Sequence, residues 1–242
     1  MRYAFFSDLH SNIFALEAVL DDVAAAGVDG RYVLGDLVGY APWPNEVLDR
    51  LRRESIPIVM GNYDDGTGFG RDECGCAYTH PVEKALGDAG FAWTKAHTSE
   101  ANRAWLRTLA PQIRFESDGR RFLLVHGSPR KTNEYLYEDK PDSTFARIAA
   151  ESDADVIVCG HTHRPYDKTV AGTRFINDGS AGKPKDGDVR ACWALVETGP
   201  QGVDVQFRRV EYDVEAAAAG ILASGLPGEF AAQLREARGF RA

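Results

Sequence analysis

The sequence contains few cysteines and no excess of basic residues, and each shortage excludes a class of protein. Its 242 residues include only four cysteines, which are too few for a disulfide-stabilised secreted domain. Acidic residues outnumber basic ones by 36 to 28, and the net charge is −8. Because binding to a nucleic-acid backbone normally requires a basic surface, nucleic acid is not the expected partner.

Long hydrophobic runs are also missing. No segment approaches the roughly 20 consecutive apolar residues that a membrane-spanning helix needs. The first apolar run, residues 3–6, is too short for the core of a signal peptide and is followed at once by Ser7 and Asp8. These absences predict a cytoplasmic protein without membrane association, and they leave its oligomeric state open.

The first two thirds of the chain alternate between strand and helix signals. Apolar runs predict strands at residues 3–6, 32–34, 56–60, 113–116, 121–125 and 155–159. Apolar faces and helix-start signals predict helices at residues 13–26, 44–53 and 143–151, and a helical stretch at residues 82–109 that breaks between 93 and 100. Residues 61–79 are rich in glycine and acids and lack periodicity, so a long loop is expected there.

The last third of the chain has a different order of predicted elements. Strands are predicted without intervening helices at residues 166–170, 174–176, 191–197 and 203–210. Two helices, near residues 215–222 and 229–238, end the chain. Together these patterns predict an α/β protein that forms a single domain over residues 1–242, in which two packed sheets are flanked by helices.

Side chains that can bind a metal follow five of the predicted strands. They are Asp8, His10, Asp36, Asn62, His126, His161 and His163. One acid or histidine after a strand is commonplace, but five recurrences are not, and four of the six histidines lie at these ends. Because ligands bind at the carboxyl ends of strands in open α/β sheets, we expect the seven side chains to meet at one site.

The composition of this set predicts the metals. Seven nitrogen and oxygen ligands are too many for one tetrahedral zinc ion, which takes four. They suit two divalent ions that share a carboxylate. Imidazole together with carboxylate favours Mn, Fe or Zn over calcium or magnesium, which prefer oxygen ligands alone.

These residues also form an ordered set of motifs. They are Asp8-Leu9-His10, Gly35-Asp36, Gly61-Asn62-Tyr63-Asp64, His126-Gly127 and Gly160-His161-Thr162-His163. The set resembles that of the calcineurin-like metallophosphoesterase superfamily, and residues 35–46, 126–130 and 177–188 resemble its small prokaryotic phosphodiesterase branch. The resemblance implies a four-layer α/β/β/α sandwich of two mixed β-sheets flanked by helices.

The resemblance also implies a role for each ligand. Asp8, His10 and His163 would hold one metal ion. Asn62, His126 and His161 would hold the other, and Asp36 would bridge the two. The implied activity is hydrolysis of phosphate esters by a hydroxide that bridges the metal ions.

One position departs from the pattern of the superfamily. Relatives usually carry a histidine where this chain has Tyr63, and in them Asp64 orients that histidine toward the phosphate. A phenol with an unperturbed pKa of about 10 is a poor proton donor at pH 7. Tyr63 and Asp64 are retained as candidate catalytic residues, and a positioning role for Tyr63 is at least as well supported.

Three further residues are candidates for binding the substrate. Asn12 begins a predicted helix, where it could contact an anion or act only as the helix cap. Arg130 and Lys183 lie in polar loops that the fold should bring to the site, and solvated loop charges are the alternative for both. The loop at residues 65–76 is either a gate over the site or disordered.

The leading interpretation is a phosphodiesterase or nucleotide hydrolase that acts on small phosphate esters. Dinucleoside polyphosphates are one candidate substrate, because some members of the small prokaryotic phosphodiesterase branch hydrolyse them. A phosphoprotein phosphatase is an alternative, but the chain has no long insertion that could form a groove for a protein substrate. A metal-binding scaffold with weak or no catalysis is a second alternative, although all seven ligand positions are kept. A nuclease is disfavoured by the acidic composition.

Overall fold

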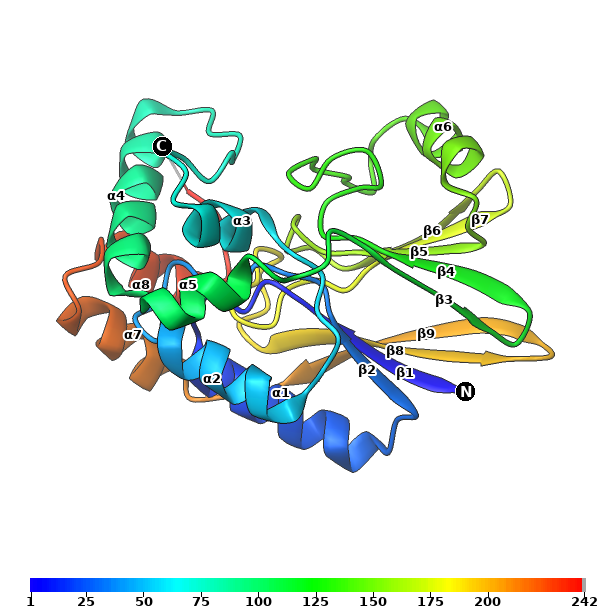
Figure 1. Cartoon of the computed structure of the whole chain (residues 1–242), viewed down its shortest axis with the longest axis horizontal. Helices are drawn as coiled ribbons and strands as arrows, with labels where there is room; N and C mark the ends of the chain where they lie inside the picture. Colours follow the sequence, from blue (N-terminus) through cyan, green and yellow to red (C-terminus); the bar gives the residue numbers. More distant parts are fainter. Residues whose placement is uncertain (241–242) are drawn as a thin grey trace.

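The computed structural model describes residues 1–240, which form two β-sheets packed face to face (Figure 1). The first sheet has the order β2-β1-β8-β9 and consists of β1 (Arg2–Phe6), β2 (Gly30–Val33), β8 (Ala191–Gly199) and β9 (Gly202–Val210). The second sheet has the order β3-β4-β5-β7-β6 and consists of β3 (Ile113–Ser117), β4 (Arg120–Leu124), β5 (Val156–Cys159), β6 (Tyr166–Val170) and β7 (Thr173–Asn177).

Helices cover the outer faces of the sheets and one end of the sandwich. They are α1 (Ile13–Ala26), α2 (Pro44–Glu54), α3 (Asn62–Phe69), α4 (Pro81–His97), α5 (Glu100–Leu106), α6 (Asp142–Ser152), α7 (Val214–Ala223) and α8 (Glu229–Glu236). None of the described helices is long and apolar enough to cross a lipid bilayer.

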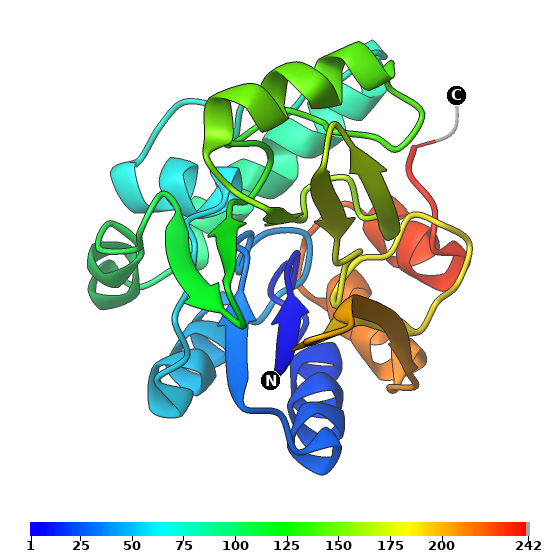
Figure 2. The same cartoon turned by 90° about the vertical axis from the view of Figure 1, so that its right-hand side faces the viewer.

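The alternation of side chains along β1 shows how the layers are held together. Ala4 and Phe6 point to one side, into a buried cluster that includes apolar residues of α1 and α2. Tyr3 and Phe5 point to the other side, into a cluster shared with β4 and β5. A third cluster joins the outer face of the second sheet to α6 (Figure 2). The expected α/β/β/α sandwich of two mixed sheets is therefore confirmed.

The direction of the strands creates a common edge. β1 runs parallel to β2 in the first sheet, and β4, β5 and β7 run parallel to one another in the second. Because parallel strands end on the same side, their carboxyl ends meet where the two sheets face each other. The expectation of one domain over residues 1–242 includes residues 241–242, which lie outside the described residues, and it stays a prediction.

Two predictions of local structure are wrong. Residues 61–79, expected to lack regular structure, contain α3, because the Asp64 carboxylate accepts the Gly61 N–H at 2.9 Å and caps the helix start. Residues 56–60 form no strand but only two isolated bridges, Val33 with Ile58 and Val59 with Ala110. Pro57 lies within this segment and has no N–H to donate, which limits regular pairing.

Candidate metal centre and cleft

Six of the seven predicted ligands lie just beyond strand ends, and Asn62 begins α3. Positive φ angles occur at five of them: Asp8 (52°), His10 (47°), Asp36 (53°), His161 (66°) and His163 (58°). This left-handed region is uncommon for residues other than glycine and costs free energy. Such conformations persist where the surrounding structure imposes them, and they concentrate at functional sites.

Glycines allow the ligand segments to approach one another. A Cβ atom on Gly61 would lie 2.1 Å from the backbone nitrogen of Asp36, and one on Gly160 would lie 2.2 Å from Ser7 Oγ. Neither approach is possible for a residue with a side chain. The glycines that the sequence places beside the ligands therefore bring both sheets to one point.

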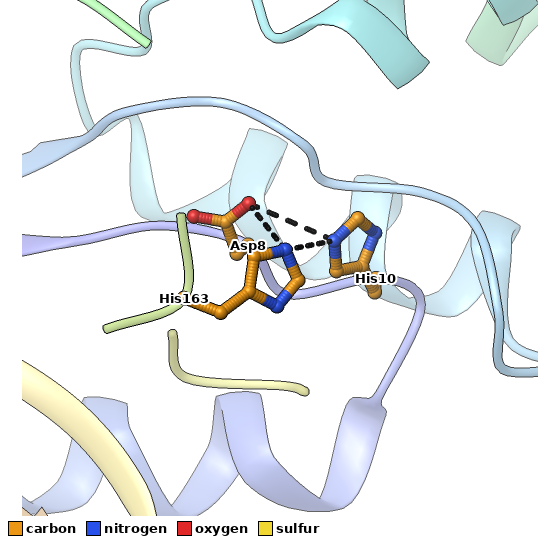
Figure 3. A group of neighbouring side chains, drawn as sticks. All are labelled: Asp8, His10 and His163. Carbon is orange, nitrogen blue, oxygen red and sulfur yellow. Dashed lines mark hydrogen bonds and ion pairs between the residues drawn. The ribbon is translucent and has the colours of Figure 1, made fainter. Parts of the chain in front are cut away.

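Asp8, His10 and His163 form the first ligand group (Figure 3). His163 Nε2 lies 3.2 Å from Asp8 Oδ1 and 3.2 Å from His10 Nε2, and His10 Nε2 lies 3.6 Å from Asp8 Oδ1. All three side chains are buried. They come from the ends of β1 and β5, which belong to different sheets.

The hydrogen bonds of this group direct two imidazole nitrogens to one point. Nδ1 of His10 lies 3.1 Å from the Val38 carbonyl oxygen, and Nδ1 of His163 lies 2.5 Å from the Lys183 carbonyl oxygen. Because a carbonyl only accepts, each Nδ1 carries the hydrogen and each Nε2 presents a lone pair. Burial lowers the pKa of both imidazoles. The neighbouring His163 lowers the pKa of His10 further, and Lys185 does the same for His163. Two lone pairs and a carboxylate that face one point repel one another unless a positive ion lies between them.

Asp36, His126 and His161 form the second ligand group, and Asn62 lies beside it. His126 Nε2 lies 3.4 Å from Asp36 Oδ1 and 3.1 Å from Asn62 Oδ1. The Asn62 amide donates to the Cys74 carbonyl at 2.9 Å, which turns its own oxygen toward His126. The Leu34 carbonyl lies 2.6 Å from His126 Nδ1 and directs Nε2 to the same point.

Asp36 lies between the two groups. One of its oxygens is 3.4 Å from His126 Nε2, and the other is 3.8 Å from His10 Nε2. Two buried atoms of the site, Asp8 Oδ1 and His161 Nε2, have no hydrogen-bond partner among residues 1–240. Unsatisfied buried acceptors are costly, and a metal ion in each group would satisfy them. The donor set and these free atoms fit a pair of divalent ions, as the sequence predicts.

Ser7 and Asp178 support Asp8, and the sequence analysis missed both. The Ser7 hydroxyl lies 2.6 Å from Asp8 Oδ2 and 2.7 Å from Asp178 Oδ1, yet it has one hydrogen to donate. Burial raises the pKa of Asp178 well above its ordinary value, so a protonated Asp178 can donate to Ser7 while Ser7 donates to Asp8. The available signal was the position of Asp178, which follows β7 as the ligands follow their strands.

Asp64 holds the backbone of the site. Its two carboxylate oxygens accept the N–H groups of Asp36, Leu37 and Gly61, each at 2.9 Å. Asp64 therefore positions the segment that carries Asp36, and no hydrogen bond joins it to Tyr63. This geometry favours a positioning role, and its catalytic role stays a prediction.

Replacing Asp64 with alanine is expected to lower the free energy of unfolding by about 3 kcal/mol, because three buried N–H groups lose their acceptor. Urea denaturation measures the change. Asp65→Ala is the matched control. Asp65 pairs with Arg71 near the surface, so its loss should cost less than about 1 kcal/mol. Equal losses in the two variants would contradict the role of Asp64.

Tyr63 packs in the interior. Its ring meets that of His10 edge-on at 5.3 Å and that of Phe91 at 5.6 Å, and its side chain is buried. Burial raises the pKa of Tyr63 well above its ordinary value, which makes the phenol an even poorer acid. Tyr63 thus supports the ring of His10, and its catalytic role stays a prediction.

A cleft of about 650 Å³ opens beside the ligand groups. Its walls include Thr162, which lies between two predicted ligands, and Tyr135, whose ring centroid is 4.0 Å from that of His161. Aromatic and basic side chains dominate the lining: Tyr40, Tyr78, Tyr135, Tyr137, Phe230, Phe240, His80, Arg164, Lys183 and Lys185. Sequence patterns missed most of these residues, although Arg164 directly follows the last ligand.

The three predicted substrate-binding residues differ in their placement. Lys183 lines the cleft. Asn12 caps α1 by accepting from the Ala15 N–H at 3.2 Å, and its amide donates to the Gly182 carbonyl at 2.9 Å. Arg130 pairs with Glu134 and does not line this cleft. Contact of these residues with a substrate stays a prediction.

Part of the segment predicted as a possible gate is helical. Residues 65–69 belong to α3, and the loop beyond it contacts the site through Cys74, which accepts from Asn62. Asn133 donates to the Gly75 carbonyl at 2.6 Å and connects this loop to the segment between β4 and α6. Its function as a gate stays a prediction.

A four-layer sandwich that carries paired nitrogen and oxygen ligand groups at its strand ends defines a class of metal-dependent hydrolases. The chain belongs to the calcineurin-like phosphoesterase superfamily, whose domain model matches residues 1–200. Members of this family hydrolyse phosphoric esters and use divalent metal ions.

Similar proteins extend over nearly the whole chain. A metallophosphoesterase from Sphaerobacter thermophilus has 30% identity and a TM-score of 0.78, over 98% of this chain and 100% of that one. A hypothetical protein from Pyrococcus horikoshii shares the fold with 22% identity and a TM-score of 0.82, over 96% and 97% of the two chains. An uncharacterised protein of Methanocaldococcus jannaschii is 30% identical over 241 residues, which cover 93% of each chain.

Proposed function

We propose that this protein is a dinuclear phosphodiesterase or nucleotide hydrolase that acts on small phosphate esters, dinucleoside polyphosphates among them. The observation that carries the proposal is the position of Asp36, which directs one oxygen toward each ligand group. A carboxylate shared in this way is typical of paired-metal sites for phosphoryl displacement. Mn, Fe and Zn match the ligand set.

Each residue of the candidate metal centre would have a separate role. Asp8, His10 and His163 would hold one ion, Asn62, His126 and His161 the other, and Asp36 both. When bound, the ions would supply Lewis-acid activation of water and of the phosphoryl oxygen. Carbonyl groups of Val38, Leu34 and Lys183 orient three of the imidazoles, and Asp64 holds the Asp36 segment.

The cleft supports a small substrate with an aromatic part. Its volume of about 650 Å³ lies within the range of small-molecule sites. The rings of Tyr135 and Tyr137 stack at 5.6 Å with planes 13° apart, and both line the cleft, where they supply aromatic contact surface for a nucleobase. The Arg164 and Lys185 side chains add positive charge for phosphate groups.

A substrate panel tests the proposal. Mn²⁺-loaded protein is assayed on bis(p-nitrophenyl) phosphate, p-nitrophenyl phosphate, dinucleoside polyphosphates and a phosphopeptide, with Asp36→Asn as the inactive control. We expect diester or nucleotide hydrolysis that a chelator removes and Mn²⁺ restores. Preference for the phosphopeptide would indicate a phosphoprotein phosphatase. Two bound metal ions without turnover of any substrate would indicate a scaffold and contradict the proposal.

A further inference from the structure

Lys185 differs from the other lysine of the cleft. Lys183 donates from Nζ to Gln233 Oε1 at 2.9 Å and lies 4.4 Å above the ring of Tyr40, so its ammonium is engaged. Lys185 is half-buried and lines the same cleft. Among the described residues its ammonium has no hydrogen bond or ion pair. Half-burying a charge without a partner is unfavourable.

This free ammonium lies beside the candidate metal centre. The Lys185 backbone N–H donates to the His163 carbonyl at 3.3 Å, which holds the Lys185 backbone beside a predicted ligand. Burial lowers the pKa of Lys185, and nearby carboxylates, those of Asp8, Glu83 and Asp36, oppose this effect. Asp8 and Asp36 belong to different ligand groups, and the attraction of both acts on the Lys185 ammonium.

With metal ions bound, the charges of the site favour an anion near Lys185. Once both ligand groups hold divalent ions, the negative charges of Asp8 and Asp36 are neutralised, and the ammonium faces cations. This repulsion is relieved when a negatively charged group lies between Lys185 and the ions. The anionic part of a phosphate ester at this centre is its phosphoryl group.

We propose that Lys185 binds a non-bridging oxygen of the phosphoryl group that is hydrolysed. This inference rests on the proposed function and assigns a catalytic contact for it. Tyr63 is buried against His10 and does not line the cleft, and Lys183 is held by Gln233. Lys185 therefore supplies the positive charge that stabilises the phosphoryl oxygens as negative charge builds up on them.

Binding of inorganic phosphate to the Mn²⁺-loaded protein tests this assignment by isothermal titration calorimetry. Lys185→Met should weaken phosphate binding about 10- to 100-fold, because a hydrogen bond between charged groups is lost. Lys185→Arg keeps the charge and should bind phosphate within about fivefold of the wild type. Lys84→Met removes an exposed lysine that pairs with Asp88, and it should bind phosphate like the wild type.

Two further readouts separate this inference from the proposed function. Mn²⁺ stoichiometry should be unchanged in Lys185→Met, and kcat/KM for a diester should fall together with phosphate affinity. Unchanged phosphate affinity in Lys185→Met, or a wild-type protein that binds no phosphate, overturns the role of Lys185. Protein that binds Mn²⁺ and phosphate through Lys185 but hydrolyses nothing supports the phosphate contact of Lys185 and contradicts the proposed function and the catalytic part of the assignment.

Discussion

Replacing Asp36 with asparagine is expected to lower kcat/KM for diester hydrolysis at least about 1000-fold, because a single change removes a charged ligand from both groups. The substitution preserves the size of the side chain. One oxygen remains to accept the Tyr63 N–H, which lies 2.8 Å from Asp36 Oδ1, so the fold should be retained. Steady-state kinetics, metal content and the unfolding temperature are measured on the same preparation.

The control for this experiment is an acid outside the site. Asp88 is exposed on α4 and pairs with Lys84, and Asp88→Asn makes the same chemical change. It should leave both metal content and activity close to those of the wild type. Retention of more than about a tenth of the activity in Asp36→Asn would show that the shared carboxylate is not needed for catalysis.

Raising the pH from 6 to 8 is expected to tighten Mn²⁺ binding about 100-fold, because binding displaces one proton from His126. Burial alone would lower the pKa of His126, but the charge of Asp36 and its contact with the imidazole outweigh burial, and the pKa rises to about 10. The metal-free protein therefore carries a proton on His126 at neutral pH. Dissociation constants measured by calorimetry between pH 6 and 8 report this competition.

The same proton gives the metal-free protein the opposite pH trend. A folded-state pKa of about 10 lies above the unfolded value of about 6.5, so the protonated imidazole stabilises the fold. This contribution is complete below pH 6.5 and is lost as the pH rises toward 10. Chelator-treated protein should unfold at progressively lower temperature over this range. His126→Asn should lose both trends, whereas His97→Asn, at an exposed position near the end of α4, should keep them. A pH-independent dissociation constant would contradict the competition.

The ligand set could be predicted because its signal is local. Each ligand follows a short apolar run within a few residues, as Asp36 and His126 do, and parallel strands bring such ends together. The two-sheet architecture followed from the change from alternating elements to consecutive strands.

The cleft could not be predicted in the same way, because its walls come from distant segments with no common pattern. Phe230 of α8 packs against Tyr40, which is nearly 200 residues away in the sequence. Gln233 of α8 contacts Lys183, which is 50 residues away. Contacts between single side chains of this kind leave no periodicity in the sequence. The partners of Asp64 are equally hidden, since they are backbone groups of another segment.

The sequence did not predict the helix α3, because its amino-acid composition disfavours helix formation. Gly66 and Gly68 lower intrinsic helix propensity. In the fold both glycines are useful, because a Cβ on Gly66 would lie 2.7 Å from the Phe91 ring and one on Gly68 would lie 3.1 Å from Leu106. Tertiary packing against α4 and α5 therefore overrides the local preference.

The left-handed backbone at five ligand positions bears on how this protein would respond to selection in the laboratory. Glycine at His10 or His163 would relax a conformation that costs roughly 1 kcal/mol, and it would also delete a ligand atom. A library screened for thermal resistance in the presence of a chelator would thus enrich inactive variants at these codons. Screening in Mn²⁺ would enrich the native residues instead, because the bound ion stabilises the left-handed backbone conformation.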